Sequence, residues 1–532
     1  MNPLLLTDGY KTGHHQQYPK GTTLVYSNFT PRSNKYAPKG CDQVVSFGQQ
    51  MVMKQIHEAF EKEFFHQPKE HVCGEMKREL SMYLNTDYDV SHFEALWDLQ
   101  YLPIAVKALP EGTLVPIKVP VLTIYNTHPD FYWVTNYLET ILSNLLWKPM
   151  TSATIAHQYR KVLTKWQEKT DAEKSWFIDW QGHDFSMRGM DSVEAVISSG
   201  VAHLTSFMGS DSLPAIYGAR KYYGAKDAVC GSVNATEHSV MCAGGKEDEV
   251  ETFRRLLETY PTGILSVVSD TWDLWKVCTE HVVTLKEEIM ARDGKLVIRP
   301  DSGDPVDILC GLNVMTEEEF IEFVYSSDYD YNTDGIGVLK DGKVYEPEVI
   351  TWPDGSTEFA GADIDSKPFT IPEQKGVIEL LWDVFGGTVN EQGYKVLDPH
   401  IGAIYGDSIT IDRADEICAR LEAKGFASTN VVLGIGSFTY QYNTRDTFGF
   451  AMKATYVEVN GVGREIFKDP ITDDGIKKSA TGLLCIEELD GKVLLYDKVS
   501  WNTEDTGLLQ LIYKDSQQYN VTSLDEIRNR LK

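Results

Sequence analysis

The feature of this sequence that most constrains its fold is an alternation of short apolar runs with amphipathic segments between Trp176 and Gly436. The apolar runs are, in chain order, WFIDW, HLTSF, AVCGSV, ILSVVS, KLVIR, IGAIYG and NVVLGIG. Helices are predicted between them at 191–199, 213–223, 247–260, 271–290, 374–385 and 412–424. Strands and helices that alternate at this spacing indicate parallel βαβ units. Seven such strands are too many for most open sheets and favour a (β/α) barrel.

The segments on either side of this alternation differ from it. The first part mixes predicted strands at 23–29, 44–47, 104–108 and 121–125 with predicted helices at 50–65 and 133–146. After Arg445 the tail is expected to form strands and a closing helix at Ser523–Leu531. Within the alternation, residues 325–372 carry two Asp-Gly turn signals and predict an inserted hairpin. We therefore predict an α+β domain from 1–175 and 441–532, and an α/β barrel domain from 176–440 that carries the active site.

Composition excludes several classes of protein. The chain has 532 residues, enough for two or three domains, and a net charge of −28, which argues against a general nucleic-acid binder. No signal peptide is recognised at the start, and no apolar stretch reaches the roughly 18 residues of a membrane helix. The eight cysteines lack any C-x-x-C spacing, which is typical of unpaired thiols in a reducing cytoplasm.

Polar or glycine-rich clusters follow nearly every predicted strand. They are the clusters HDFSMRG at 183–189, GSD at 209–211, EH at 237–238, SD at 269–270, RPDSGD at 299–304, GDS at 406–408 and GIGS at 434–437. In a (β/α) barrel the carboxyl ends of the strands meet at one mouth, where such enzymes bind their substrates. A solvated loop explains one such cluster, but so many indicate a shared site.

The residues at this mouth suggest a sugar phosphate. Asp270, Asp301 and Asp407 offer acceptors for sugar hydroxyls or for Mg²⁺, which prefers carboxylates together with substrate phosphates. Arg188 and Arg299 suit bidentate phosphate contacts. The glycines at 434–436 would let backbone N–H groups approach an anion. On these features alone a glycosidase and a phosphosugar isomerase both remain open.

Nine motifs resemble, in their order along the chain, those of the nicotinamide phosphoribosyltransferase family, a group of type II phosphoribosyltransferases. They are TDGYKTGHHQQYP, HDFSMRG, GSDS, ATEHS, SVVSD, IRPDSGDP, YGDS, TRD and FKDP. The resemblance implies an irregular (β/α) barrel and a second α+β domain built from both chain ends, in a cytoplasmic head-to-tail homodimer. It also implies transfer of the phosphoribosyl group of 5-phosphoribosyl 1-pyrophosphate to nicotinamide, which yields nicotinamide mononucleotide and pyrophosphate in NAD salvage.

The same resemblance implies roles at the base and the sugar. Phe185 would stack on the pyridine ring, with Tyr10 of the other subunit on the opposite face. Asp211 would accept a hydrogen bond from the carboxamide N–H, and Ser266 would donate one to its carbonyl.

The sugar would contact a second set of residues, all at strand ends. Arg299 and Asp301 would hold the phosphoribosyl part, with Gly406 and Asp407 on the ribose and Asp270 nearby.

The implied phosphate contacts are mostly cationic. Ser437 and Arg445 would bind the 5′-phosphate, whereas Arg188 and His238 would face pyrophosphate. Further cationic positions implied by the resemblance are Arg32, Lys453 and Lys477. Mg²⁺ is the implied cofactor, and ATP would activate by phosphorylating His238, which with Asp301 and Arg299 forms the implied catalytic set.

Two alternatives remain at this stage. The first is nicotinate phosphoribosyltransferase, from which Asp211 would discriminate because a buried carboxylate repels the carboxylate of nicotinate. The second is a non-catalytic nucleotide-binding or signalling protein on the same fold.

Overall fold

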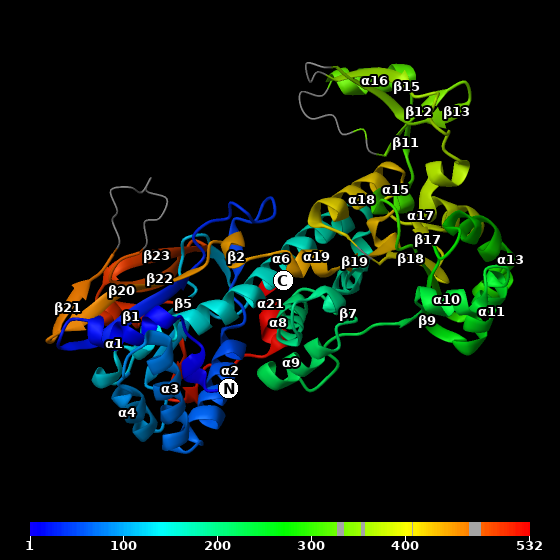
Figure 1. Cartoon of the computed structure of the whole chain (residues 1–532). Helices are drawn as coiled ribbons and strands as arrows, with labels where there is room; N and C mark the ends of the chain where they lie inside the picture. Colours follow the sequence, from blue (N-terminus) through cyan, green and yellow to red (C-terminus); the bar gives the residue numbers. More distant parts are fainter. Residues whose placement is uncertain (327–332, 334, 353–356, 407, 468–479) are drawn as a thin grey trace.

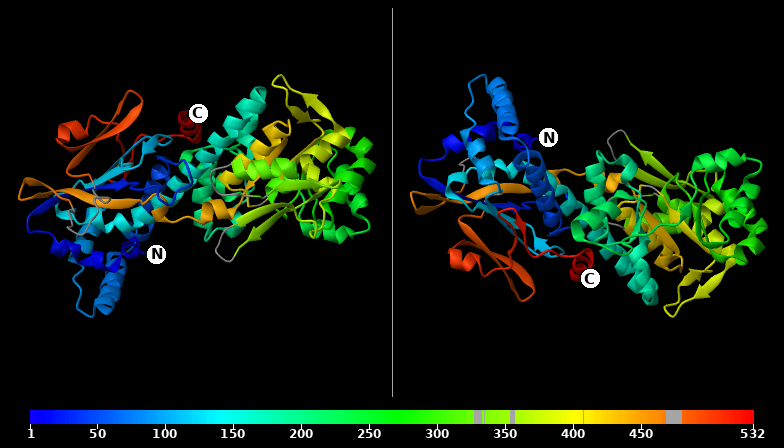
Figure 2. Two further views of the ribbon diagram at one scale, coloured as in Figure 1. Left: turned by 90° about the horizontal axis from the view of Figure 1, so that it is seen from above. Right: turned by 90° about the horizontal axis from the view of Figure 1, so that it is seen from below.

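The computed structural model describes residues 1–326, 333, 335–352, 357–406, 408–467 and 480–532. Two large sheets dominate it, one parallel and one antiparallel, and they lie toward opposite ends of an elongated molecule (Figures 1 and 2). Within these residues, no helix combines the length and the apolar character that a membrane crossing needs.

The parallel sheet has seven strands in the described part of the chain, in the order β7-β6-β19-β18-β10-β9-β8. Their bounds are Gly182–Asp184 (β6), Gly209–Ser210 (β7), Asn234–Ala235 (β8), Thr262–Val268 (β9), Asp293–Arg299 (β10), Ile401–Tyr405 (β18) and Val431–Ile435 (β19). All neighbours pair in parallel, as the alternation predicts. The sheet forms a half-barrel, and a single parallel bridge between Gly209 and Gly231 connects β7 with the segment that leads into β8.

Helices cover the outer side of the half-barrel. They are α8 (Val193–His203), α9 (Pro214–Tyr223), α10 (His238–Gly244), α11 (Glu249–Thr259), α15 (Pro305–Cys310), α17 (Ile371–Phe385) and α18 (Ile411–Ala423). The predicted helix at 271–290 is instead broken into α12 (Leu274–Lys276), a π-helical turn, α13 (Val282–Thr284) and α14 (Lys286–Met290).

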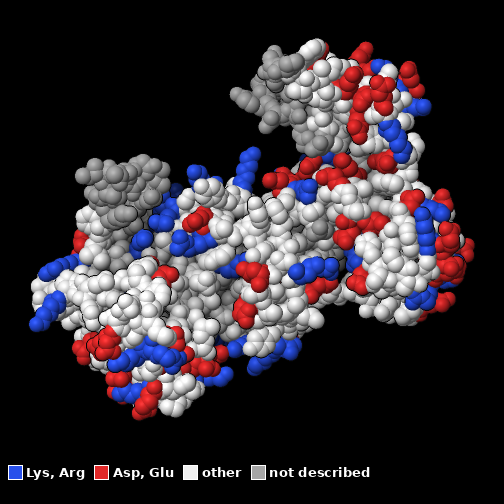
Figure 3. Space-filling model, in the orientation of Figure 1, with Lys and Arg blue, Asp and Glu red and all other residues white. Residues whose placement is uncertain are grey.

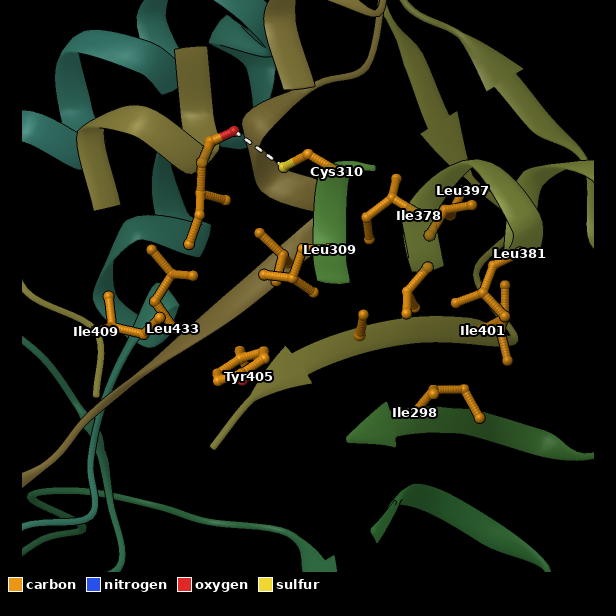
Figure 4. Close-up of a cluster of buried hydrophobic side chains, with 14 of the residues drawn as sticks. Ile298, Leu309, Cys310, Ile378, Leu381, Leu397, Ile401, Tyr405, Ile409 and Leu433 are labelled. Atoms are coloured by element: carbon orange, nitrogen blue, oxygen red, sulfur yellow. Dashed lines mark hydrogen bonds between the residues drawn. The ribbon is translucent and has the colours of Figure 1, made fainter. Parts of the chain in front are cut away.

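The core of the half-barrel lies between these helices and the strands (Figure 4). Ile298 of β10 and Ile401 of β18 are fully buried there with Leu381 of α17. The Cys310 thiol at the end of α15 donates to the carbonyl of Ile417 in α18, at 3.5 Å. This packing holds the carboxyl ends of β10 and β18 in fixed positions.

The antiparallel sheet combines strands from both ends of the chain. Its order is β21-β20-β1-β5-β3-β24-β25. The bounds are Thr22–Thr30 (β1), Ile104–Ala108 (β3), Leu122–Asn126 (β5), Ala451–Val459 (β20), Val462–Glu465 (β21), Gln510–Lys514 (β24) and Gln517–Gln518 (β25). Beside it lie α1 (His14–Gln17), α2 (Gln49–Phe60), α3 (Lys69–Leu84), α4 (Ser91–Leu99) and α5 (Val134–Tyr137). The sequence-based expectation of a sheet built from both chain ends is therefore confirmed.

One long helix, α6 (Glu139–Thr170), joins the two sheets. Its first half, with Leu142 and Leu146, packs in the core of the antiparallel sheet, and its second half, with Tyr159 and Leu163, packs in the core of the half-barrel. The predicted helix at 133–146 therefore continues much further than expected. Because α6 belongs to both cores, the domain limits at 175/176 and 440/441 stay predictions.

The last helix, α21 (Leu524–Leu531), begins with a capping box between Ser523 and Glu526. Its apolar side packs against α8 and α9, on the half-barrel, although it follows strands of the other sheet. The remaining short elements are β2 (Gln43–Val45), β4 (Leu114–Pro116), α7 (Ile178–Gln181), β16 (Gly387–Val389), β17 (Lys395–Leu397), α19 (Ser437–Gln441), β22 (Leu483–Leu489), β23 (Lys492–Val499) and α20 (Trp501–Glu504).

Three of the predicted barrel strands are wrong in position. WFIDW forms a 3-10 turn and α7, HLTSF is the end of α8 and the turn after it, and AVCGSV is mostly irregular. The strands begin a few residues later, at Gly182, Gly209 and Asn234. These runs are apolar because the helix ends and turns that they form are buried in the protein. His203 is fully buried and Phe207 is only 1% exposed.

The predicted insertion is larger than one hairpin. It comprises β11 (Asn313–Thr316), α16 (Glu317–Ser326), β12 (Ile336–Lys340), β13 (Lys343–Tyr345), β14 (Pro347–Thr351) and β15 (Thr357–Ala362), with a small core of its own. Figure 1 shows this subdomain projecting from the half-barrel. Asp341 and Gly342 form the β12–β13 turn with positive φ angles, as the Asp-Gly signal predicts, whereas the second signal lies outside the described residues.

Candidate active site

The carboxyl ends of the parallel strands gather most of the residues that the sequence singles out. Phe185 follows β6, Asp211 follows β7, Asp270 follows β9, and Asp301 follows β10. Gly406 follows β18, whose end is adjacent to that of β10. The expected convergence at one edge of the sheet is therefore found.

The turn after β10 contains two aspartates, Asp301 and Asp304, that have different roles although they occur in the same sequence motif. Asp304 caps α15, because its carboxylate accepts from the backbone N–H groups of Val306 and Asp307. Asp301 caps nothing, and its backbone N–H donates to Asp270 Oδ2 at 2.9 Å. Asp301 thus belongs to the site and Asp304 to the helix.

His238 lies at the start of α10 beside two carboxylates. Its Nδ1 is 3.1 Å from Thr271 Oγ1, and its Nε2 is 3.9 Å from both Asp270 Oδ1 and Asp301 Oδ2. The Asp270 side chain is only 5% exposed, and its Oδ1 is buried with no hydrogen-bond partner in the described part of the chain. A buried carboxylate oxygen without a donor is costly, so it is suited to a cation or a substrate hydroxyl.

Arg299 lies within the same group of charges. Its guanidinium donates to the carbonyl of Thr236. Burial lowers the pKa of Arg299, while the carboxylates of Asp301, Asp211 and Asp270 act in the opposite direction. Arginine stays charged despite this shift, so the site contains a half-buried fixed cation.

Asp211 is held by two side-chain donors. His183 Nε2 is 2.9 Å from Asp211 Oδ1, and the Ser232 hydroxyl donates to the same oxygen. Burial alone would raise the pKa of Asp211, but these hydrogen bonds, together with nearby charge such as that of Arg299, outweigh it and the pKa is lowered. Asp211 is therefore an ionised acceptor at neutral pH.

Phe185 and Ser266 also lie at this edge of the sheet. The Phe185 ring is half-buried, with its centroid 4.6 Å from that of His183 and an interplanar angle of 32°. Ser266 in β9 is 3% exposed, and its hydroxyl is buried with no hydrogen-bond partner in the described residues. An aromatic face and an unsatisfied hydroxyl are the features that a small aromatic amide requires.

The turn that contains Arg188, after β6, packs against Ser437, which follows β19. Gly189, next to Arg188, packs so closely on Ser437 that a β-carbon at 189 would overlap the serine side chain. Gly434 is needed for a similar reason, since a β-carbon there would lie 2.6 Å from the carbonyl oxygen of Tyr405.

The more distant cations form a second group. Arg32 donates from Nε to the carbonyl of Gly449, at 3.0 Å, and its pKa is lowered by burial and by the nearby charge of Arg445. Lys453 lies in β20, and its backbone carbonyl accepts from Asn28. The two other predicted positions, Asp407 and Lys477, lie outside the described residues.

Tyr10 is not brought together with the other site residues. Its ring is 66% exposed and lies in the turn before α1, in the part of the molecule that contains the antiparallel sheet (Figure 1). Its neighbours are His14, with ring centroids 5.6 Å apart, and the Lys11 ammonium. Within one chain, therefore, Tyr10 does not complete the site.

Three residues of this site have no role in the sequence-based prediction: His183, Ser232 and Thr236. His183 could have been found, because residues two apart in a strand lie on the same face and Phe185 was already a candidate. Ser232 and Thr236 lie in an irregular segment, where sequence gives no such periodicity.

The carboxylates of this site are the candidate ligands for a metal ion. No cluster of three or more His, Cys, Asp or Glu side chains with metal-binding geometry exists in the described ranges. The buried Oδ1 of Asp270 and the carboxylate of Asp301 nevertheless fit a cation that takes its other ligands from substrate phosphates, as Mg²⁺ commonly does.

The fold described above also occurs in a solved phosphoribosyltransferase. The structure is similar to that of human nicotinic acid phosphoribosyltransferase, with a TM-score of 0.55 and 16% identity over 99% of this chain and 92% of that one. At that identity the likeness supports the fold alone.

The sequence comparisons define the family. Residues 180–515 match the nicotinate phosphoribosyltransferase (NAPRTase) family, and residues 2–94 match the N-terminal domain of nicotinamide phosphoribosyltransferase. The chain is 47% identical to nicotinamide phosphoribosyltransferase of Acinetobacter baylyi, over 100% of this chain and 97% of that protein. It is 31% identical to the Mycoplasma pneumoniae protein of the same name, over 88% and 92%. The chain therefore belongs to the nicotinate phosphoribosyltransferase family.

Proposed function

We propose that this protein is an enzyme of NAD salvage that transfers the phosphoribosyl group of 5-phosphoribosyl 1-pyrophosphate to nicotinamide. The products are nicotinamide mononucleotide and pyrophosphate. The observation that carries this proposal is the full-length relationship to the Acinetobacter baylyi enzyme, whose name states the same activity. An ionised Asp211, the aromatic ring of Phe185 and the unsatisfied hydroxyl of Ser266 together support nicotinamide rather than nicotinate as the base.

In this proposal the base binds between aromatic rings and polar side chains. Phe185 stacks on the pyridine ring, Asp211 accepts from the carboxamide N–H, and the unsatisfied Ser266 hydroxyl donates to its carbonyl. Orientation of the ring nitrogen toward the ribose is the main contribution of these contacts, because pyridine nitrogen is a weak nucleophile and gains most from alignment.

The sugar and its phosphates bind along the strand ends. Asp301 and Arg299 hold the phosphoribosyl part, with Gly406, Asp407 and Asp270 around the ribose. Cationic and hydroxyl groups stabilise the charge that develops on the departing pyrophosphate, and others bind the constant charge of the 5′-phosphate. The residues proposed for these phosphates are Arg188, His238, Ser437, Arg445, Arg32, Lys453 and Lys477.

Mg²⁺ belongs to this proposal as the cofactor. Asp270 and Asp301 would hold it together with pyrophosphate oxygens, and when bound it neutralises the charge of the leaving group. Charge is distributed unevenly over the surface. Acidic side chains gather over the half-barrel end and the α16 subdomain, whereas basic ones are frequent on the middle of the same face (Figure 3).

We further propose that the working form is a two-fold homodimer in which Tyr10 of one subunit completes the site of the other. A second proposal is that the half-barrel belongs to an irregular (β/α) barrel fold. The exposed aromatic ring of Tyr10 and its location outside its own site support the first proposal. A cytoplasmic location is also proposed, since all eight cysteines are unpaired thiols, as in a reducing compartment.

One assay tests the activity. The protein is incubated with Mg²⁺, 5-phosphoribosyl 1-pyrophosphate and either nicotinamide or nicotinate, and the mononucleotides are separated. Nicotinamide mononucleotide should form in excess, and the absence of both products would contradict the proposal.

The Asp211→Asn variant tests the specificity. It should use nicotinamide less well and reject nicotinate less strongly, because the repulsive charge is gone and an amide can donate to a carboxylate. An unchanged ratio of the two kcat/KM values would show that Asp211 does not recognise the amide.

A further inference from the structure

Three segments that are distant in sequence converge on one carboxylate oxygen of Asp211. His183 comes from β6, Asp211 follows β7, and Ser232 precedes β8. Both the imidazole Nε2, at 2.9 Å, and the serine hydroxyl donate to Oδ1. Oδ2 is thus the oxygen of Asp211 without a side-chain donor in the described part of the chain.

The geometry also defines the tautomer of His183. An ionised carboxylate only accepts hydrogen bonds, so the neutral imidazole must carry its proton on Nε2. The Nδ1 edge of the ring lies over Gly209, where an added β-carbon would be 2.7 Å from Nδ1. Gly209 has no positive φ angle, so glycine is needed here for space rather than for conformation.

We propose that His183 is a positioning residue that sets the preference of this site for an amide over a carboxylate. This inference rests on the proposed function. His183 and Ser232 both donate to Oδ1 of Asp211, which holds the carboxylate in one orientation and leaves Oδ2 to accept the amide N–H of the base.

The reason lies in the orientation of the carboxylate. The donors from His183 and Ser232 both bind Oδ1, so they hold the carboxylate of Asp211 in one orientation. Without His183, Oδ1 loses one of these two donors and the carboxylate can turn. Oδ2 then no longer meets the amide N–H in a fixed position, so the site discriminates less well between an amide and a carboxylate.

The test compares two substitutions of the same residue. His183→Leu removes the donor, and His183→Gln keeps an N–H group at a similar reach. The measurement is kcat/KM for nicotinamide and for nicotinate, in the presence of Mg²⁺ and saturating 5-phosphoribosyl 1-pyrophosphate. His183→Leu should lower the ratio of the two values by about ten-fold or more, the effect of one lost hydrogen bond to a charged group. His183→Gln should restore most of it.

His183 also contacts Phe185, and the same kinetics separate the two routes. A role through stacking would raise KM for both bases equally and leave the ratio unchanged, which would overturn the inference. A role through Asp211 predicts further that, in the Asp211→Asn background, His183→Leu leaves the ratio as it is in Asp211→Asn alone. A second, additive fall in the double variant would also overturn the inference.

Gly209→Ala is the matched variant that leaves the imidazole intact. Its methyl group should displace the His183 ring and lower the ratio in the same direction as His183→Leu. If the thermal melt shows that His183→Leu does not fold, Gly209→Ala provides the test in its place. An unchanged ratio of the two kcat/KM values in folded Gly209→Ala would contradict the inference. Failure of the proposed function is distinguishable, because then the unmodified protein itself would make no mononucleotide.

Discussion

At the scale of single residues, Gly406 leaves the space that Asp301 occupies. A β-carbon at 406 would lie 2.7 Å from Asp301 Oδ1. The φ angle of Gly406 is not positive, so alanine is allowed there by the backbone. The consequence of Gly406→Ala should therefore be confined to the displaced carboxylate.

We predict that Gly406→Ala lowers kcat/KM for 5-phosphoribosyl 1-pyrophosphate by roughly 100-fold, the cost of a catalytic group displaced by about 1 Å. The melting temperature should change little. Gly74→Ala is the matched control, since it lies in α3 with no atom near the added methyl group, and it should keep full activity. Full activity of Gly406→Ala would show that Asp301 is not needed where it lies.

His238 offers a second prediction at this scale. Its Nδ1 is hydrogen-bonded to Thr271, which leaves Nε2 next to Asp270 and Asp301. If Nε2 takes a phosphoryl group from ATP, the neighbouring carboxylates and Mg²⁺ must accommodate it. ATP should then lower the nicotinamide concentration needed for half-maximal rate, and His238→Ala should abolish that benefit while some basal synthesis remains. A wild-type enzyme that is indifferent to ATP, or a variant that still responds, contradicts this mechanism.

Sequence reasoning identified the aspartates of the site better than their partners. Asp301 and Asp304 occur in one motif, and only the structure assigns Asp304 to a helix cap. Ser232 and Thr236 could not be predicted, because their contacts come from an irregular segment with no periodic pattern. Such residues belong to the site because of contacts with residues that are distant in the sequence, and a local sequence pattern does not reveal those contacts.

At the scale of elements, the central strands of the half-barrel were predictable and the outer ones were not. β9, β10, β18 and β19 are buried apolar runs that end at turn residues, so pattern and structure agree. β6, β7 and β8 have only two or three residues, and the apolar runs near them belong to helix ends and turns. Very short strands are defined by their neighbours rather than by their own sequence.

A cluster of histidine rings lies beside the segment that contains Tyr10. This cluster predicts that the stability of the fold depends on pH. The His15 and His92 rings are stacked with centroids 3.7 Å apart, and Tyr88 donates to the carbonyl of Thr12. Burial, and then the charge of His15, lower the pKa of His92 to about 3, with Asp89 acting weakly in the opposite direction. Burial also lowers the pKa of His15.

The sign of the effect follows from proton binding. Between about pH 6.5 and pH 3 the unfolded chain protonates His92 and the folded chain does not, so the free energy of unfolding falls as the pH falls. We predict that the melting temperature decreases from pH 7 to pH 5, and that His92→Phe makes this decrease smaller. His66→Phe, at a side chain 70% exposed, should keep the wild-type slope. Equal slopes for wild type and His92→Phe would contradict the prediction.

At the scale of the whole molecule, the two sheets divide the proposed work. The half-barrel provides Phe185, Asp211 and the proposed phosphoribosyl contacts, whereas the turn that contains Tyr10 leads into α1, which lies with the antiparallel sheet (Figure 1). A site that needs residues from both ends of this elongated molecule can be completed by a second copy of the chain that is arranged head to tail. Two-fold symmetry then forms two equivalent sites.

The last prediction tests this arrangement by mixing two inactive variants. Tyr10→Ala should remove stacking and Asp211→Ala should remove amide recognition at every site of the respective homodimers, so each protein should be nearly inactive. In a mixed dimer with shared sites, one site collects both defects and the other collects neither. Equal amounts refolded together should form mixed dimers in about half of all cases, because pairing is random between equivalent subunits.

The measurement is nicotinamide mononucleotide synthesis after the two variants are unfolded and refolded together, compared with each refolded alone. Activity should rise toward about a quarter of the wild-type value, since half of the dimers then have one of two sites intact. Differently tagged subunits, recovered together, verify that mixed dimers have formed. If they have formed and activity does not rise, each site is built within one chain, and Tyr10 must serve some purpose other than stacking on the base.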